Sequence, residues 1–417
     1  MTRPNWIASL AKGLTRPKRL HARSLSRHMI SSGWSARVNN ASLALYQRGC
    51  VMWILKFLGL ILMALAGLVL GVLLAGLALL WYLSPGTAQP VFDAEGRDVP
   101  GSISTVERVT LGGAEQGLII RGADATAPVM LFLHGGPGSP EYPFLRQTNL
   151  GLEDDFVMVY WQQRGAGMSF AGVKPEDMTL AQLTADTAEL ATLMATRFGK
   201  RKIYLMGHSW GTLLGMSTIR QHPELFHAYF GIGNVGNQIE GERVGLEWLK
   251  QRAREGADEA LIAALSALEV PDADAGFEEW GTYMRAERPI LDAMGGGMMH
   301  QPITMMTVLK WVLATPEYRL GDKLNYGRGL LFSLENMWPE VVSTNLIETA
   351  GPIDIPVFFL QGAWDYQTPT PLARALFEAI DAPLKEYVEF ENSAHSPIME
   401  EPEKFNAFVR AAAFQRE

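Results

Sequence analysis

The sequence contains a single cysteine, Cys50, among 417 residues. No disulfide can form within the chain, so the fold does not depend on one in any cellular compartment. His and Cys residues are also not clustered at the spacings of a metal site. We therefore expect neither a structural metal nor a cofactor, and any chemistry has to come from ordinary side chains.

Acidic residues are absent from the first 92 positions, which hold ten of the 36 Lys and Arg residues. All 44 acidic residues lie from Asp93 onward, so the body of the chain is strongly acidic. Such a body repels phosphate backbones, and we expect no nucleic-acid partner. With 48% hydrophobic residues, the chain is long enough for a large α/β core plus an insertion.

Charged side chains are missing from Phe57 to Leu83, a run of 27 residues. As a helix this run would be roughly 40 Å long and would cross a hydrocarbon core of about 30 Å. Trp53 at one end, and Trp81 and Tyr82 at the other, suit the membrane interface. We predict an uncleaved transmembrane helix over 57–83. A cleaved signal peptide is the alternative, although its apolar region normally spans about 7–15 residues.

The basic N-terminal side predicts the orientation of this helix. We expect residues 1–56 to be a disordered cytoplasmic segment, residues 84–101 a linker, and the body to be periplasmic or extracellular. If Met52 is the true start, Lys56 is the only positive flank that remains. Cys50 is either an acylation site or an inert thiol.

Small residues recur within the apolar run as Gly67-x-x-x-Gly71-x-x-x-Ala75. This spacing lets two helices approach closely, so a homodimer through the membrane helix is a further expectation.

Strand-like runs alternate with helical patterns in the body, which predicts a mostly parallel sheet covered on both faces. The stretch 236–349 interrupts the alternation and is helix-rich, with several Trp and a Met cluster. We interpret it as a helical cap inserted into a core of residues 102–235 and 350–417. The predicted strands are Val106–Leu111, Gly117–Arg121, Val129–Leu133, Phe156–Trp161, Lys202–Met206, Ala228–Ile232, Val357–Leu360 and Tyr387–Phe390.

The most informative motif is Gly-His-Ser-Trp-Gly at 207–211, which follows an apolar β-type run and precedes a helix-compatible stretch. This is the context of a nucleophile elbow, in which a sharp turn lifts a serine out of the sheet toward the N-terminus of the next helix. We predict that Ser209 is a nucleophile. The alternative is an ordinary Gly-rich turn.

A serine nucleophile needs a base, and the base needs an acid to orient it. Asp365 follows the buried strand that begins at Val357, and His395 follows the strand that ends at Phe390. Both therefore lie beyond the carboxyl ends of late strands, at the same edge of the sheet as Ser209, which we call the rim. The chain order Ser, acid, His is the one that this chemistry uses. A turn aspartate and a solvated loop histidine are the alternatives.

The predicted strand ending at Leu133 continues into His-Gly-Gly-Pro-Gly at 134–138. A Gly-rich turn lets backbone N–H groups approach a substrate carbonyl. We expect an oxyanion hole formed by the N–H of Trp210 together with that of Gly136 or Gly135.

These motifs, together with Gln-Gln-Arg-Gly-Ala-Gly at 162–167, resemble the proline iminopeptidase branch of the α/β-hydrolases. The resemblance covers about residues 105–235 and 350–417, and the cap matches only in position. It implies the α/β-hydrolase fold, the set Ser209, Asp365 and His395, and hydrolysis of a small amide or ester, typically with release of an N-terminal proline. The family usually has Asp at position 162 and often Gly at 208. The implied specificity also needs cap carboxylates that hold an ammonium group, for which Glu240 and Glu335 are the candidates.

We therefore predict a membrane-anchored serine hydrolase acting through an acyl-enzyme on a small peptide or ester. A carboxylesterase or lipase-like hydrolase is the alternative within the same chemistry. A non-catalytic binding protein that keeps the fold is an alternative of another class.

The charge asymmetry gives a testable orientation. Alkaline phosphatase fused after Glu417 should be active in cells, because the body is expected outside the cytoplasm. The control is the same fusion placed after Lys56, before the apolar run, which should be inactive. An inactive alkaline phosphatase in the C-terminal fusion would place the body in the cytoplasm and would contradict the predicted orientation.

Overall fold

The computed structural model describes residues 40–93 and 95–414. The chain divides between Val72 and Leu73 into two compact units, which are treated separately. The first element within the described residues is α1 (Asn40–Tyr82). Its segment Leu45–Tyr82, with a mean hydropathy of 2.8, is long and apolar enough to cross a membrane. The helix begins well before Phe57, so residues 40–56 are helical where we expected disorder. Residues 1–39 of that segment lie outside the described residues.

One eight-stranded sheet organises the body, in the order β1-β2-β4-β3-β5-β6-β7-β8. The pairs β1–β2 and β2–β4 are antiparallel, and the remaining pairs are parallel. The predicted mostly parallel sheet is thus confirmed. The strands are β1 (Ile103–Leu111), β2 (Ala114–Gly122), β3 (Val129–Leu133), β4 (Val157–Trp161), β5 (Ile203–His208), β6 (Phe226–Ile232), β7 (Val357–Gly362) and β8 (Lys385–Phe390).

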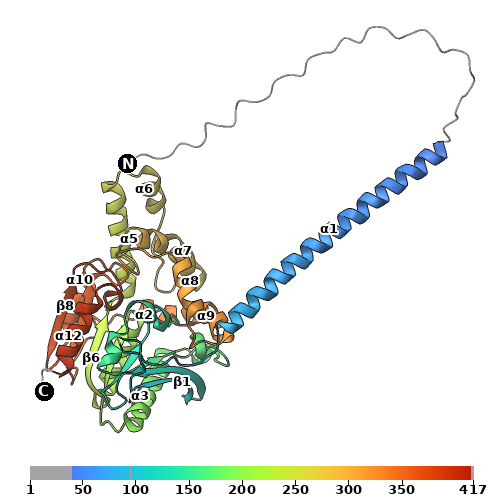
Figure 1. The fold of residues 1–417 in the computed structure, drawn as a ribbon. Helices are drawn as coiled ribbons and strands as arrows, with labels where there is room; N and C mark the ends of the chain where they lie inside the picture. Colours follow the sequence, from blue (N-terminus) through green and yellow to red (C-terminus); the bar gives the residue numbers. More distant parts are fainter. Residues whose placement is uncertain (1–39, 94, 415–417) are drawn as a thin grey trace, which may run out of the picture. The chain divides into compact units, whose positions relative to one another are not determined.

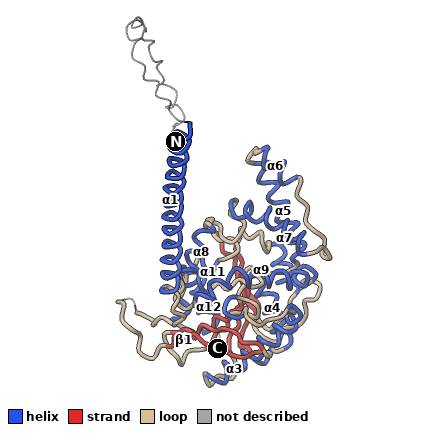
Figure 2. The backbone as a smooth tube through the Cα atoms, turned by 90° about the vertical axis from the view of Figure 1, so that its right-hand side faces the viewer, coloured by secondary structure: helices blue, strands red, loops and turns tan. Residues whose placement is uncertain are grey.

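Helices cover both faces of the sheet (Figures 1 and 2). Alternate residues of β3 point to opposite faces, so Leu131 and Leu133 join one hydrophobic core while Met130 and Phe132 join the other. This double burial explains why the strand is apolar throughout. The first core includes α3 (Leu180–Arg197), α4 (Trp210–Gln221) and α10 (Thr370–Ala379). The second includes α2 (Tyr142–Thr148), α11 (Pro397–Glu400) and α12 (Pro402–Phe414).

Four short 3₁₀ helices complete the core within the described residues. They are η1 (Gly151–Asp154), η2 (Gly167–Ser169), η3 (Pro175–Asp177) and η4 (Pro223–Leu225).

Five helices lie between β6 and β7, in the stretch expected to form a cap. Trp280 and Trp338 are buried against each other with ring centroids 5.7 Å apart, so these tryptophans are core rather than ligand wall. Trp248 stacks on Tyr366 with centroids 4.2 Å apart, which fixes the insertion to the loop after β7. The helices are α5 (Gln238–Glu255), α6 (Glu259–Ser266), α7 (Phe277–Ala293), α8 (Met305–Ala314) and α9 (Leu320–Ser343).

Candidate active site

Ser209 is the single residue between β5 and α4. Its backbone has a conformation that residues other than glycine rarely adopt. Its φ is 56° and its ψ is −123°. Outside glycine such positive φ values are uncommon, and they cluster at functional sites where the surrounding structure enforces them. The turn leaves Ser209 at the N-terminus of α4, where unpaired backbone N–H groups favour negative charge.

The two glycines of the motif are required by close backbone approach. A Cβ placed on Gly207 would lie 2.3 Å from the carbonyl oxygen of Gly211. A Cβ on Gly211 would lie 2.2 Å from the carbonyl oxygen of Leu133, at the end of β3. Backbone atoms cannot move aside as a flexible side chain can, so any larger residue would force the turn open.

Asp365 and His395 are hydrogen-bonded partners, with Asp365 Oδ2 2.9 Å from His395 Nδ1. Both side chains are buried. The carboxylate also accepts bonds from the backbone N–H groups of Gln367 and Thr368, the Thr368 hydroxyl and the Gln361 amide. These donors fix the carboxylate in place. The carboxylate in turn orients the His395 ring by accepting a hydrogen bond from Nδ1.

The end of β6 brings Ser209 and His395 to the same rim. Ser209 N donates to the carbonyl oxygen of Ile232 at 2.8 Å. The next residue, Gly233, lies so close to the His395 ring that an added Cβ would be 2.8 Å from Nδ1 and Cε1. Between the described residues no hydrogen bond joins the Ser209 hydroxyl to His395. Such bonds are often long or poorly aligned before substrate binds.

The Gly-rich turn after β3 lies against the Ser209 side chain. A Cβ on Gly135 would be 3.0 Å from Ser209 Cβ. The Gly135 N–H already donates to Glu141 Oε1 at 3.1 Å, so it is not available to a substrate. Gly136 has a φ of 112°, which glycine tolerates and other residues avoid. Gly135 and Gly136 are the two predicted oxyanion-hole donors on this turn. Between described residues, only the Gly135 N–H donates to Glu141.

His134 and Gln163 hold this turn in shape. His134 Nε2 accepts from Gln163 N at 3.1 Å, which requires the proton on Nδ1 for its bond to the Gly135 carbonyl oxygen at 2.9 Å. Burial lowers the pKa of His134 to about 4, so the ring is neutral in this role. The Gln163 amide donates to the His134 carbonyl oxygen and accepts from Trp210 Nε1. One side chain thus connects the two proposed donor segments.

His208 forms a buried bridge between this turn and the His395 loop. Its Nε2 lies 2.8 Å from the carbonyl oxygen of His395, and its Nδ1 lies 2.6 Å from Glu141 Oε1. Because a carbonyl oxygen only accepts, Nε2 carries a proton, and a second proton lies between Nδ1 and Glu141. Burial is the largest single influence on the pKa of His208 and lowers it. The charge and hydrogen bond of Glu141, the backbone of His395 and the charge of Asp365 together outweigh burial and raise the pKa.

Glu240 and Glu335 are not brought to the rim by any contact between described residues. Glu240 pairs with Arg243 on the exposed side of α5, and Glu335 is exposed on α9. The buried carboxylates of the cap are Glu242 and Glu287, which both contact Arg288, together with Glu317 and Asp322. Burial raises the pKa of Glu287. The ammonium-binding role of Glu240 and Glu335 stays a prediction.

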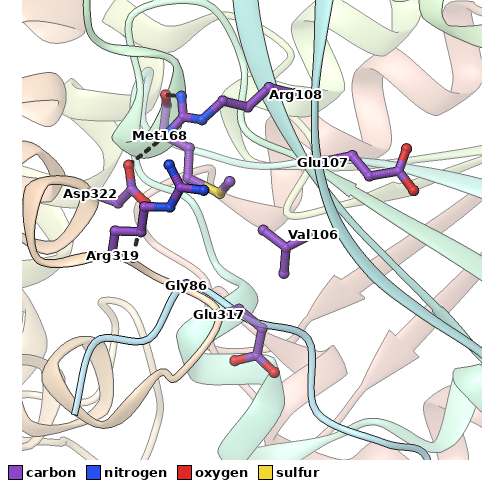
Figure 3. Close-up of a pocket in the computed structure, with 8 residues that line it drawn as sticks. All are labelled: Gly86, Val106, Glu107, Arg108, Met168, Glu317, Arg319 and Asp322. Atoms are coloured by element: carbon purple, nitrogen blue, oxygen red, sulfur yellow. Dashed lines mark hydrogen bonds and ion pairs between the residues drawn. The ribbon is translucent and has the colours of Figure 1, made fainter. Parts of the chain in front are cut away.

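A pocket of about 190 Å³ opens elsewhere, where the linker meets the cap (Figure 3). Ser209, Asp365 and His395 are not among the residues that line this pocket. Over His395 the cap lies close, because the Gly297 carbonyl oxygen accepts from His395 N at 3.2 Å. The Gly296 carbonyl oxygen accepts from Tyr366 N in the same way, at 3.0 Å. The cap therefore contacts the backbone next to Asp365 and the backbone of His395.

Sheet topology, strained serine and capped rim define a class of protein. The sequence model of the alpha/beta hydrolase fold matches residues 128–402, and the chain belongs to this family. It is a hydrolase of the proline iminopeptidase-like branch, as its motifs implied.

Two relatives and one solved structure illustrate the likeness. The probable aminopeptidase YbaC of Bacillus subtilis is 30% identical over 307 residues, which cover 73% of this chain and 94% of that protein. The proline iminopeptidase of Heyndrickxia coagulans is 26% identical over 284 residues, covering 67% and 88%. The structure of the Mycobacterium smegmatis proline iminopeptidase matches with a TM-score of 0.55 at 18% identity, covering 75% and 98%, and supports the fold alone.

The raised pKa of His208 gives a stability test. We expect His208→Gln to cost about 1–3 kcal/mol of unfolding free energy near pH 6, because it removes a charged hydrogen bond. A raised folded-state pKa contributes stability fully below the unfolded value of about 6.5 and loses it as pH rises through the folded value. The cost should therefore shrink as the pH rises above about 6.5 and through the raised folded-state pKa, as measured by denaturant unfolding of the full chain in detergent.

The matched control is His222→Gln, at an exposed histidine whose partner is the surface residue Glu224. That variant should change stability little at any pH. A cost of His208→Gln that grows with pH would contradict the shared proton between His208 and Glu141.

Proposed function

We propose that the chain is a membrane-anchored serine hydrolase that cleaves a small amide or ester through an acyl-enzyme, with Ser209, His395 and Asp365 as the catalytic residues. The observation that carries the proposal is the convergence at one rim of a strained serine and a hydrogen-bonded acid–histidine pair. The five hydrogen-bond donors around Asp365, His395 included, support its role as the orienting carboxylate.

In this mechanism His395 takes the hydroxyl proton as Ser209 Oγ attacks the substrate carbonyl carbon. The oxyanion accepts hydrogen bonds from the backbone N–H groups of Trp210 and Gly136. His395 then gives its proton to the leaving amine or alcohol as the scissile bond breaks. Water repeats the sequence on the acyl-enzyme and releases the acid, which restores Ser209.

The anchor in this proposal is α1. Its apolar length, its lack of buried side chains and the basic residues before it support an uncleaved transmembrane helix with the hydrolase body outside the cytoplasm. Exposed Cys50 lies within the same helix, on the side that would be cytoplasmic. The Gly67, Gly71 and Ala75 spacing supports the homodimer proposed for this segment.

Labelling by a fluorophosphonate probe tests the nucleophile. The full chain should be labelled, and Ser209→Ala should abolish labelling and lower turnover by several orders of magnitude. Ser217→Ala, farther along the same helix, is the matched control and should be labelled like the parent chain. Labelling of Ser209→Ala would exclude Ser209 as the nucleophile. An unlabelled parent chain would favour the non-catalytic binding protein.

The substrate class follows from a direct comparison. Relatives named as aminopeptidases support a substrate with a free N-terminus, so kcat/KM for a prolyl arylamide should exceed that for a short-chain aryl ester. Among the described residues no hydrogen bond or ion pair joins Glu240 or Glu335 to the rim, and this favours the alternative, a carboxylesterase. Faster turnover of the ester, together with no effect of Glu240→Gln or Glu335→Gln, would replace the aminopeptidase assignment.

A further inference from the structure

Helix α8 is apolar almost all round and yet lies at the surface of the cap. Its sequence is Met-Met-Thr-Val-Leu-Lys-Trp-Val-Leu-Ala. Met305 is 79% exposed, Met306 58% and Leu309 47%. A helix of this composition is normally buried on every side, and an exposed apolar group of this kind marks an interaction surface.

The inward side of α8 is firmly packed, so the exposed side is not a sign of a loose helix. Val312 is buried in the second hydrophobic core. Trp311 packs against Phe144 of α2, with ring centroids 6.0 Å apart. The N-terminus of α8 is capped by Thr304, whose hydroxyl accepts from Thr307 N. The outward methionines and Leu309 are therefore held in a fixed position.

The position of α8 is tied to the end of α1. A single ammonium group, Lys323 Nζ, donates to the carbonyl oxygen of Leu83 at 2.7 Å and to that of Leu313 at 2.6 Å. Leu83 is the last residue of the predicted transmembrane segment 57–83, and Leu313 belongs to the last turn of α8. Just beyond, Gly86 N donates to the Pro316 carbonyl oxygen at 3.0 Å. Gly86 also borders the pocket that contains Arg319 (Figure 3).

These contacts leave α8 one natural partner. If the apolar run of α1 ends at the membrane surface near Leu83, the last turn of α8 is held within a few ångströms of that surface. A ten-residue helix is about 15 Å long, a size that lies readily in the interface. Lys310, which is exposed, would meet lipid headgroups while Met305, Met306 and Leu309 enter the acyl boundary.

We propose that the exposed side of α8 is a second membrane contact, which inserts into the lipid interface and seats the cap on the bilayer. This inference rests on the proposed anchoring by α1. The partner is the lipid surface itself. The body is then attached at two points, α1 and the cap, rather than hanging from a flexible tether.

A fluorescence quenching experiment on the full chain tests this contact. Single cysteines are introduced at Met306, at Leu193 and at Leu70 in a Cys50→Ser background and are labelled with an environment-sensitive dye. Leu193 is the matched control, because it is an apolar residue 40% exposed on α3, which lies well apart from α8 in both views (Figures 1 and 2). Leu70 reports on α1. The chain is reconstituted in phosphatidylcholine vesicles with or without doxyl-labelled lipid.

We expect doxyl lipid to quench the dye at 306 at least about twofold more strongly than the dye at 193, as suits an interfacial helix. Strong quenching at 70 combined with equal, weak quenching at 306 and 193 would overturn the α8 contact and leave the anchor intact. No quenching at 70 would overturn the anchor and, with it, this inference. Protection of 306 from aqueous iodide without quenching by doxyl lipid would show that a second copy or another protein covers α8, which also overturns the proposal.

Discussion

The tightest constraint in the molecule is the backbone at Ser209, which turns from β5 into α4 with a positive φ. This turn closes only because Gly207 and Gly211 allow main-chain atoms to approach where a Cβ would collide. The collision partner of Gly211 is the end of β3, the strand that continues into the Gly-rich turn. The geometry of the serine and the geometry of that turn are therefore set by the same contact, and neither can relax without the other.

Electrostatics around the rim follow from burial beside specific hydrogen-bond partners. For two histidines there, these partners decide where the protons lie. Burial keeps His134 neutral, with its proton directed at the Gly135 carbonyl oxygen. His208 instead shares a proton with Glu141 and donates to the backbone of His395. Three histidines within one small region thus have three different roles, and the environment rather than the residue type assigns them.

The sequence predicted all eight strands and their two-sided burial, because apolar β-type runs separated by helical patterns leave little choice of fold. It also placed Asp365 and His395 beyond the correct strand ends. It did not predict Glu141 or Gln163, because their bonds depend on how distant loops meet in space and leave no local spacing to read. The ammonium-binding role of Glu240, which is half-buried on α5, and of Glu335, which is exposed on α9, stays a prediction. The helical start at Asn40 was missed because polar residues there mask the continuity of α1.

Helix α9 lies directly on both Gly-rich loops of the core. Gly138 faces Ser333 so closely that a Cβ would be 2.5 Å from the Ser333 Cβ, and Gly329 contacts the backbone of Gly165 in the same manner. Farther toward its N-terminus, the Tyr326 hydroxyl donates to the Pro140 carbonyl oxygen at 2.9 Å. The insertion is consequently not an interchangeable module. A chimera that borrows the helical segment of another hydrolase would have to import the matching loops of the core as well, since the two surfaces are complementary at the level of single methyl groups.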